Sequence, residues 1–178
     1  MKTYTLLSCL ILLGGCKTST IPNNSSIVVG TSKIEKNKEY CPKDGECNIT
    51  LHQNASILLK QDTPNTYYPT IEKGEKIVVV FEFLIKGPEG TADGDYSETI
   101  HFEIDKDVET LNINGEKLKQ ANLIFGKHCF CRGEAGYYKI KEGNLSIHRL
   151  KDNISMDLSF KINEISHKIN RINKVIKI

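Results

Sequence analysis

Residues 128–131 read His-Cys-Phe-Cys, which places the imidazole of His128 within three positions of two thiols, Cys129 and Cys131. Thiolate and imidazole ligands suit zinc and copper, and a close pair of thiols can also carry disulfide exchange. Structural zinc sites usually separate their cysteines by roughly two to four residues, and the common redox motif is Cys-x-x-Cys beside a βαβ unit. Neither spacing is present, so the redox compartment of the chain decides between a reactive site and a structural disulfide.

The first sixteen residues bear on that compartment. Lys2 precedes a short apolar run over residues 6–13, which ends in Leu13-Gly14-Gly15-Cys16. The run is shorter than the roughly 18 residues of a membrane-spanning helix, and the segment has the form of a secretory signal peptide. Its end resembles the lipobox of bacterial lipoproteins. The resemblance implies cleavage before Cys16, lipidation of Cys16 and anchoring in the cell envelope; an ordinary cleaved signal peptide is the alternative.

Three regions follow from this interpretation. We expect a signal peptide over residues 1–15, a lipidated Cys16 with a flexible polar tether over residues 16–35, and one domain over residues 36–178. Lys17 stands where an aspartate retains lipoproteins at the inner membrane under the familiar sorting rule of Gram-negative envelopes. The resemblance therefore favours the outer membrane over the inner one.

Composition limits the classes of partner. The 178 residues are 39% hydrophobic and carry a formal net charge of +2, which suits one globular domain with a real core. Nucleic-acid binders usually concentrate basic charge on one face, and no such concentration is evident. We expect no nucleic-acid partner; the expected partners are a membrane, through the lipid anchor, and an envelope protein.

From about residue 38 onward, short runs of alternating apolar and polar residues predict strand after strand. In residues 76–86 the apolar face is Ile77, Val79, Phe81, Phe83 and Ile85, and residues 98–105 alternate in the same way. Turn signals occur at residues 72–76, 87–95, 112–116 and 141–144. Regular strands without a long amphipathic helix predict an all-β, antiparallel β-sandwich, with an immunoglobulin-like arrangement as one possibility.

Residues 162–178 are ambiguous between helix and strand. Ile162, Ile165, Ile169, Ile172 and Ile176 follow a spacing typical of one helical face. The segment is nevertheless rich in asparagine and isoleucine, which are poor helix formers, and its last five residues have the character of a strand. We expect two strands joined near residues 166–168.

Four cysteines remain in the expected domain: Cys41, Cys47, Cys129 and Cys131. An even number in an exported domain predicts two disulfides, and of the three connectivities we favour Cys41–Cys47 with Cys129–Cys131. Residues 41–47 have the character of a hairpin in which Gly45 supplies a positive φ. In a regular strand Cys129 and Cys131 would be slightly too far apart, so their pairing requires a bent backbone near Gly133.

Two tyrosine doublets, Tyr67-Tyr68 and Tyr137-Tyr138, are the best candidates for a contact surface. On a strand one residue of each pair faces outward, and exposed tyrosines with a polar rim are typical of binding patches. The chain contains no tryptophan, which disfavours carbohydrate stacking. Weaker candidates are a calcium loop over residues 93–98, which lacks the expected glycine and closing glutamate, and an acid–base role for His101 and Glu103, which are expected to be exposed.

We therefore expect a membrane-anchored lipoprotein of the envelope that binds or supports other components and is not an enzyme. No catalytic residue, metal or cofactor is assigned. The alternative is an envelope thiol-redox or metal-binding protein that uses His128, Cys129 and Cys131. A hydrolase stays open as well, because catalytic triads are assembled in space and not in sequence.

Overall fold

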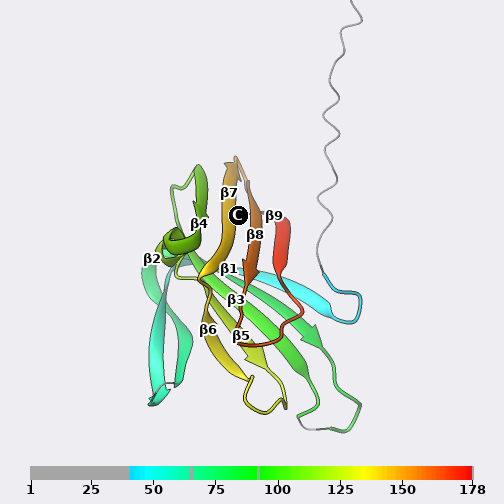
Figure 1. Cartoon of the computed structure of the whole chain (residues 1–178). Coiled ribbons are helices and arrows are strands. Elements are labelled where there is room, and N and C mark those ends of the chain that lie inside the picture. Colours follow the sequence, from blue (N-terminus) through cyan, green and yellow to red (C-terminus); the bar gives the residue numbers. More distant parts are fainter. Residues whose placement is uncertain (1–40, 65, 92, 178) are drawn as a thin grey trace, which may run out of the picture. The chain divides into compact units, whose positions relative to one another are not determined.

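The computed structural model describes residues 41–64, 66–91 and 93–177. The expected signal peptide, the lipidation at Cys16 and the tether lie outside the described residues. The described part is an all-β sandwich of two antiparallel sheets, which confirms the predicted fold class (Figure 1). Among these residues, no helix is long and apolar enough to cross a membrane.

The first sheet has five strands in the order β1-β2-β3-β5-β6. Each neighbouring pair is antiparallel, and β1, β2 and β3 follow one another as hairpins. The bounds are β1 Glu46–Thr63, β2 Thr66–Ile85, β3 Tyr96–Asp105, β5 Ile124–His128 and β6 Gly136–Lys139.

The second sheet has four strands in the order β4-β7-β8-β9, and it is antiparallel as well. Its strands are β4 Thr110–Asn114, β7 Glu142–Leu150, β8 Asn153–Lys161 and β9 Arg171–Lys177, and the short 3-10 helix η1 Gly115–Ala121 follows β4. Of the two strands expected over residues 162–178, the second is present as β9, whereas residues 162–165, expected to be strand, belong to a loop over residues 162–170. The strand order differs from the immunoglobulin arrangement, in which the chain crosses between sheets after its second strand.

The main core lies between the two sheets. The predicted inward face of β2 is confirmed, since Val79 and Phe83 are fully buried, as are Ile100 and Phe102 of β3. Leu145, Ile147, Leu158 and Ile172 complete the core from the second sheet. β-Branched and aromatic residues at every second position bury one side of each strand, and this burial is the main stabilising term.

A buried polar network connects the loop over residues 162–170 to the first sheet. The carboxylate of Glu98, a fully buried residue of β3, accepts hydrogen bonds from the backbone N–H groups of Lys168 (2.6 Å) and Ile169 (2.7 Å). Lys127 of β5 is also buried, and its ammonium group donates to the Ser166 carbonyl (2.8 Å) and to the Glu134 carboxylate. Loop groups without strand partners are satisfied in this way, which explains two buried charged residues in a β core.

The disulfides have the connectivity that the sequence ranks first. Cys41 pairs with Cys47 at a Cα–Cα distance of 5.9 Å, and Cys129 pairs with Cys131 at 5.2 Å, where the chain bends after the end of β5. Gly45 differs from the prediction, because its φ is not positive. A Cβ at Gly45 would lie 2.4 Å from the Phe83 ring, so close packing explains this glycine.

Residues 72–76 were expected to form a turn, and this expectation is wrong. β2 runs through them, and the turn of the β1–β2 hairpin lies beyond Thr63. The glycine and charged residues instead mark an irregularity in pairing, where Ala55 is opposite both Lys73 and Lys76 and Asn54 has a φ of 55°. A β-bulge at this position divides the long hairpin into a part inside the sheet and a distal part, residues 55–63 and 66–73, here called the distal hairpin.

Candidate binding groove

The distal hairpin presents one face to the outer surface of the first sheet. Ile57 pairs with Ile71 in the β1–β2 register, and two residues farther Leu59 pairs with Pro69. Because cross-strand partners and residues two apart share a face, these side chains lie on one side of the distal hairpin. Tyr67, opposite Gln61, belongs to the same face.

A second hydrophobic cluster lies beneath this face and is separate from the main core. Its buried members are Ala55, Ile57, Val78 and Ile124, and Leu59, Ile71, Val80 and Tyr137 pack against it. Val78 alternates with the inward-facing Ile77 and Val79, so it lies on the outer surface of the sheet. The distal hairpin therefore covers apolar surface that a regular sandwich would leave in water.

Two polar contacts connect the distal hairpin to the rest of the domain. The Glu103 carboxylate of β3 accepts a hydrogen bond of 2.5 Å from the Ile57 N–H, and Lys76 lies 3.6 Å from the same carboxylate. The Asn122 side chain, just after η1, donates to the Ile57 carbonyl at 3.5 Å. Glu103 is thus nearly buried by the distal hairpin, so the expectation of an exposed His101–Glu103 pair is wrong.

The side chain of Tyr137 in β6 packs over a glycine of the neighbouring strand β5. It is directly opposite Gly126 of β5, where an added Cβ would lie 2.7 Å from its ring and 2.5 Å from the Thr99 hydroxyl. The ring also meets His128 edge-on at a centroid distance of 5.2 Å and His101 at 6.4 Å. An aromatic ring over a strand glycine restores the packing that the glycine lacks, which fixes the position of Tyr137.

Burial shifts the pKa values of the tyrosine and histidine side chains on this surface. It raises the pKa of the Tyr137 hydroxyl, which keeps the group neutral and able to donate a hydrogen bond. Burial, with smaller contributions from the charges of His128 and His52, lowers the pKa of His101 to about 4. The same cause lowers the pKa of His128. At neutral pH the surface around Tyr137 therefore carries uncharged imidazoles.

Between the distal hairpin and β6 the surface is hollowed. The hollow has a volume of about 330 Å³. It is lined by Leu59, Tyr67, Ile124, Tyr137, Tyr138 and Lys139. We call this the tyrosine hollow. Apolar walls with a few polar tips, here the hydroxyl groups of tyrosine, are typical of sites that bind ligands or partner side chains.

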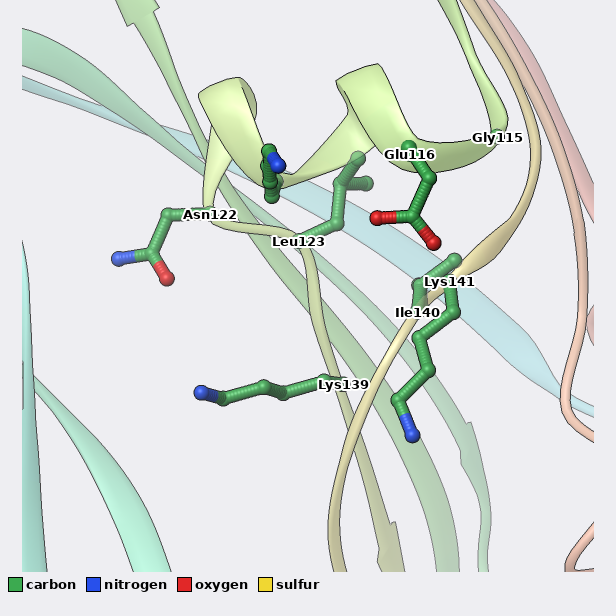
Figure 2. A pocket seen from close by; sticks show the side chains of 8 residues that line it. Gly115, Glu116, Asn122, Leu123, Lys139, Ile140 and Lys141 are labelled. Atoms are coloured by element: carbon green, nitrogen blue, oxygen red, sulfur yellow. The ribbon is translucent and has the colours of Figure 1, made fainter.

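A second hollow of about 330 Å³ shares Lys139 with the first and continues toward η1. Figure 2 shows Glu116 and Asn122 on the η1 side, with Lys139 and Lys141 projecting from the opposite wall. Lys119 also lines it. Within the described part of the chain, none of these three lysines forms an ion pair. We call the two hollows together the tyrosine–lysine groove.

No family model matches this chain. No curated protein and no solved structure matches it either. The groove is therefore interpreted from its own residues.

The structure brings three of the four predicted tyrosines together. Tyr67, from one doublet, lies in the same hollow as Tyr137 and Tyr138, from the other. Tyr68 pairs with Lys60 on the opposite face of the distal hairpin and does not line the hollow. Tyr67 is 47% exposed and Tyr68 38% exposed, so both side chains of the first doublet are accessible.

The residues of the His-Cys-Phe-Cys stretch do not converge on a metal-binding geometry. His128 contacts Tyr137 on the outer surface of the sheet, and Cys129 and Cys131 are paired with each other. Over residues 41–64, 66–91 and 93–177, no three His, Cys, Asp or Glu side chains form a group that could hold a metal ion. In the weak calcium candidate, Asp95 bonds Lys86 and the Gly87 N–H, while Glu98 is buried in the network described above.

Sequence analysis missed the lysines of the groove. Lys119, Lys139 and Lys141 are separated by up to 22 positions and look like ordinary exposed lysines in the sequence. Only the crossing of the chain from β6 to β7 beside η1 brings them together. The Tyr137–Gly126 pairing did carry a signal, since a glycine inside a strand often marks close approach by another group.

Proposed function

We propose that this chain is a membrane-anchored lipoprotein of the bacterial cell envelope, lipidated at Cys16, whose domain is a non-enzymatic binding module. The lipobox-like end of the leader supports the anchor, and outer-membrane placement rests on Lys17. Each methylene group of an acyl chain contributes about 0.8 kcal/mol to membrane binding when it is buried. A cysteine that carries more than one acyl chain is therefore anchored stably. The disulfides fit an exported domain.

The observation that carries the binding role is the convergence of tyrosines from both doublets in one hollow. Tyr67 and Tyr137 are 70 positions apart, and the bulged hairpin places them on opposite sides of the same concave surface. Tyrosine offers a large rigid contact area with a polar tip, which is why it is enriched at interfaces. The groove therefore suits a side chain or short segment of an envelope protein.

The lysines predict the charge of that partner. Lys119, Lys139 and Lys141 surround one end of the groove, and Glu116 is the acidic residue of its lining. Unpaired charges around an interface steer encounter with the opposite charge and select against partners of like charge. We expect the bound segment to carry aspartate or glutamate next to an apolar or aromatic anchor.

Two experiments test the proposal. Mass spectrometry of the N-terminal peptide, from chain expressed in bacteria, should find an acylated Cys16 at the new N-terminus; an unmodified Cys16 or an intact leader would contradict the anchor. For the groove, Tyr67→Ala should weaken association with envelope partners while Tyr68→Ala should not. Equal effects of the two substitutions would contradict the groove.

A further inference from the structure

Phe130 stands at the tip of the β5–β6 connection and is 95% exposed. Scattered surface apolar residues are normal, but this one is held in place. The disulfide joins the residues on either side of it, and Gly133 continues the turn with a φ of 80°. The ring is thus displayed on a short covalently closed loop, here called the Phe130 tip (residues 129–134).

Buried groups support the base of the Phe130 tip. The Lys127 ammonium group bonds the Glu134 carboxylate and the Ser166 carbonyl, and the Tyr138 hydroxyl donates to the Glu134 carbonyl at 2.9 Å. Both ends of the loop are therefore attached to the sandwich. A side chain displayed on a rigid loop loses little conformational entropy when a contact forms, which favours its use as an anchor.

The Phe130 tip lies at the end of the sandwich where the chain enters the domain. The β2–β3 and β5–β6 connections lie in the lower part of Figure 1, and the β8–β9 loop is attached at the same end through the bonds of Ser166 to Lys127 and of Lys168 to Glu98. The disulfide loop that begins at Cys41 is there too, because Lys168 of the β8–β9 loop bonds Asp44 at 2.7 Å. The segment from Cys16 to the domain is attached at this same end, at Cys41, and its 24 residues can span at most about 86 Å, so a lipid on Cys16 keeps the end that carries the Phe130 tip within reach of the bilayer.

The charges at this end are close to balanced. Lys86 pairs with Asp95, and Lys168 pairs with Asp44. The other charges of these connections, apart from the Lys127–Glu134 pair, are the positive Lys43 and Arg132 and the negative Glu89, Asp93 and Glu164. A basic patch, which would attract anionic lipids, is therefore not formed by these residues. A contact made through the Phe130 tip is apolar and insensitive to salt.

We propose that the Phe130 tip inserts into the interfacial region of the bilayer that carries the chain's own lipid anchor. Phenylalanine is one of the residues that bury at the boundary between headgroups and acyl chains. The proposal rests on the anchor of the proposed function, because tethering supplies the high effective concentration that lets one aromatic side chain hold a contact. The insertion would fix this end of the sandwich toward the membrane.

The absence of tryptophan from the chain provides a direct test. The full chain with Phe130→Trp, reconstituted into phosphatidylcholine vesicles, carries a single tryptophan whose emission reports its surroundings. We expect a blue shift on reconstitution and quenching by lipids brominated on the upper acyl chain, unchanged between low and high salt. The matched control is Leu150→Trp, since Leu150 is 55% exposed and lies at the end of β7, away from the Phe130 tip.

Equal quenching of the two tryptophans, or no shift for Phe130→Trp, would overturn the proposal and leave a protein partner as the alternative for the Phe130 tip. Mass spectrometry on the same samples reports acylation of Cys16 separately. A lipidated chain without quenching contradicts the insertion alone, whereas an unlipidated chain contradicts the anchor. For unlipidated chain, a maleimide lipid attached to the Cys16 thiol supplies the same tether, and absence of a shift for Phe130→Trp then overturns the insertion too.

Discussion

The Glu103 carboxylate accepts a hydrogen bond from the backbone N–H of Ile57 at 2.5 Å. This contact joins the last part of β3 to the β1 strand of the distal hairpin, just beyond the bulge and 46 positions away in the sequence. β1 is the edge strand of its sheet, so the N–H groups on its outer side have no ladder partner, and here a carboxylate satisfies one of them. This acidic side chain therefore helps to hold one wall of the groove, together with the Asn122 contact and the apolar cluster beneath the distal hairpin.

Glu103→Ala should destabilise the domain and loosen the distal hairpin. The substitution leaves the Ile57 N–H unpaired, which costs about 1–3 kcal/mol in free energy of unfolding. Urea unfolding measures the loss, and amide exchange at Ile57 should accelerate more than exchange at Val79 in the main core. Glu103→Gln keeps an acceptor oxygen and is the control; equal losses for both variants would show that the charge matters more than the hydrogen bond.

Gly126→Ala should displace Tyr137 from the sheet. The new methyl group would lie 2.5 Å from the Thr99 hydroxyl and 2.7 Å from the Tyr137 ring, so one of them must move. Overpacking of this kind costs about 1–3 kcal/mol, and the change in the groove should weaken partner binding as well. In a Tyr137→Ala background the same substitution no longer meets the tyrosine ring and crowds only the Thr99 hydroxyl among its nearest atoms, so its cost should be smaller. Unchanged NMR shifts for the Tyr137 ring in Gly126→Ala would contradict the prediction.

Acidification from about pH 6.5 to pH 4 should lower stability through His101. Its pKa is lowered to about 4 in the folded chain, mainly by burial, against 6.5 when unfolded. Between these values the unfolded state binds the proton and the folded state does not, so stability falls as pH falls. The loss is about 1–3 kcal/mol and levels off below the folded pKa.

His101→Leu should remove that part of the pH dependence. Urea unfolding at several pH values between 4 and 7 gives the slope for each variant. Replacement of His148, which is exposed on the second sheet, serves as the control and should keep the wild-type slope. Identical slopes for the wild-type chain and His101→Leu would assign the acid sensitivity to other groups.

Removal of the Cys41–Cys47 disulfide by a double substitution to serine should lower the free energy of unfolding modestly. The closed loop is short, because the cysteines are six positions apart, and the chain-entropy model then predicts about 2 kcal/mol. The loss should appear in urea unfolding without a change in partner binding, since neither cysteine lines the groove. A loss of binding with intact stability would contradict this separation.

The alternation of apolar and polar residues predicted the sandwich well, because every second side chain of a strand is buried in the core. Ile77, Val79 and Phe83 stand on one face in the sequence and in the core, and the isoleucines after residue 170 follow the strand preference of their type. The disulfide pairing also follows from short-range geometry, because the two cysteines of each pair are only six and two positions apart in the sequence.

The groove could be predicted only in part because it depends on contacts between distant segments. The residues around Gly74 have the composition of a turn, and only pairing with β1 turns them into a bulge inside a longer strand. The fold of the distal hairpin over the sheet then buries Glu103 and brings Tyr67 toward Tyr137. The tyrosine types suggested a contact surface, but not which three of them share it.

The difference between Tyr67 and Tyr68 tests the binding role most directly. The two residues are adjacent and both exposed, yet Tyr67 lines the tyrosine hollow and Tyr68 lies on the opposite face of the distal hairpin. A photo-crosslinking phenylalanine analogue at each position, in the full chain in living cells, compares these faces under the same conditions. We expect a discrete protein adduct from position 67 that is absent from position 68 and lost on Tyr137→Ala. The same adducts from both positions, or none from position 67, would contradict it.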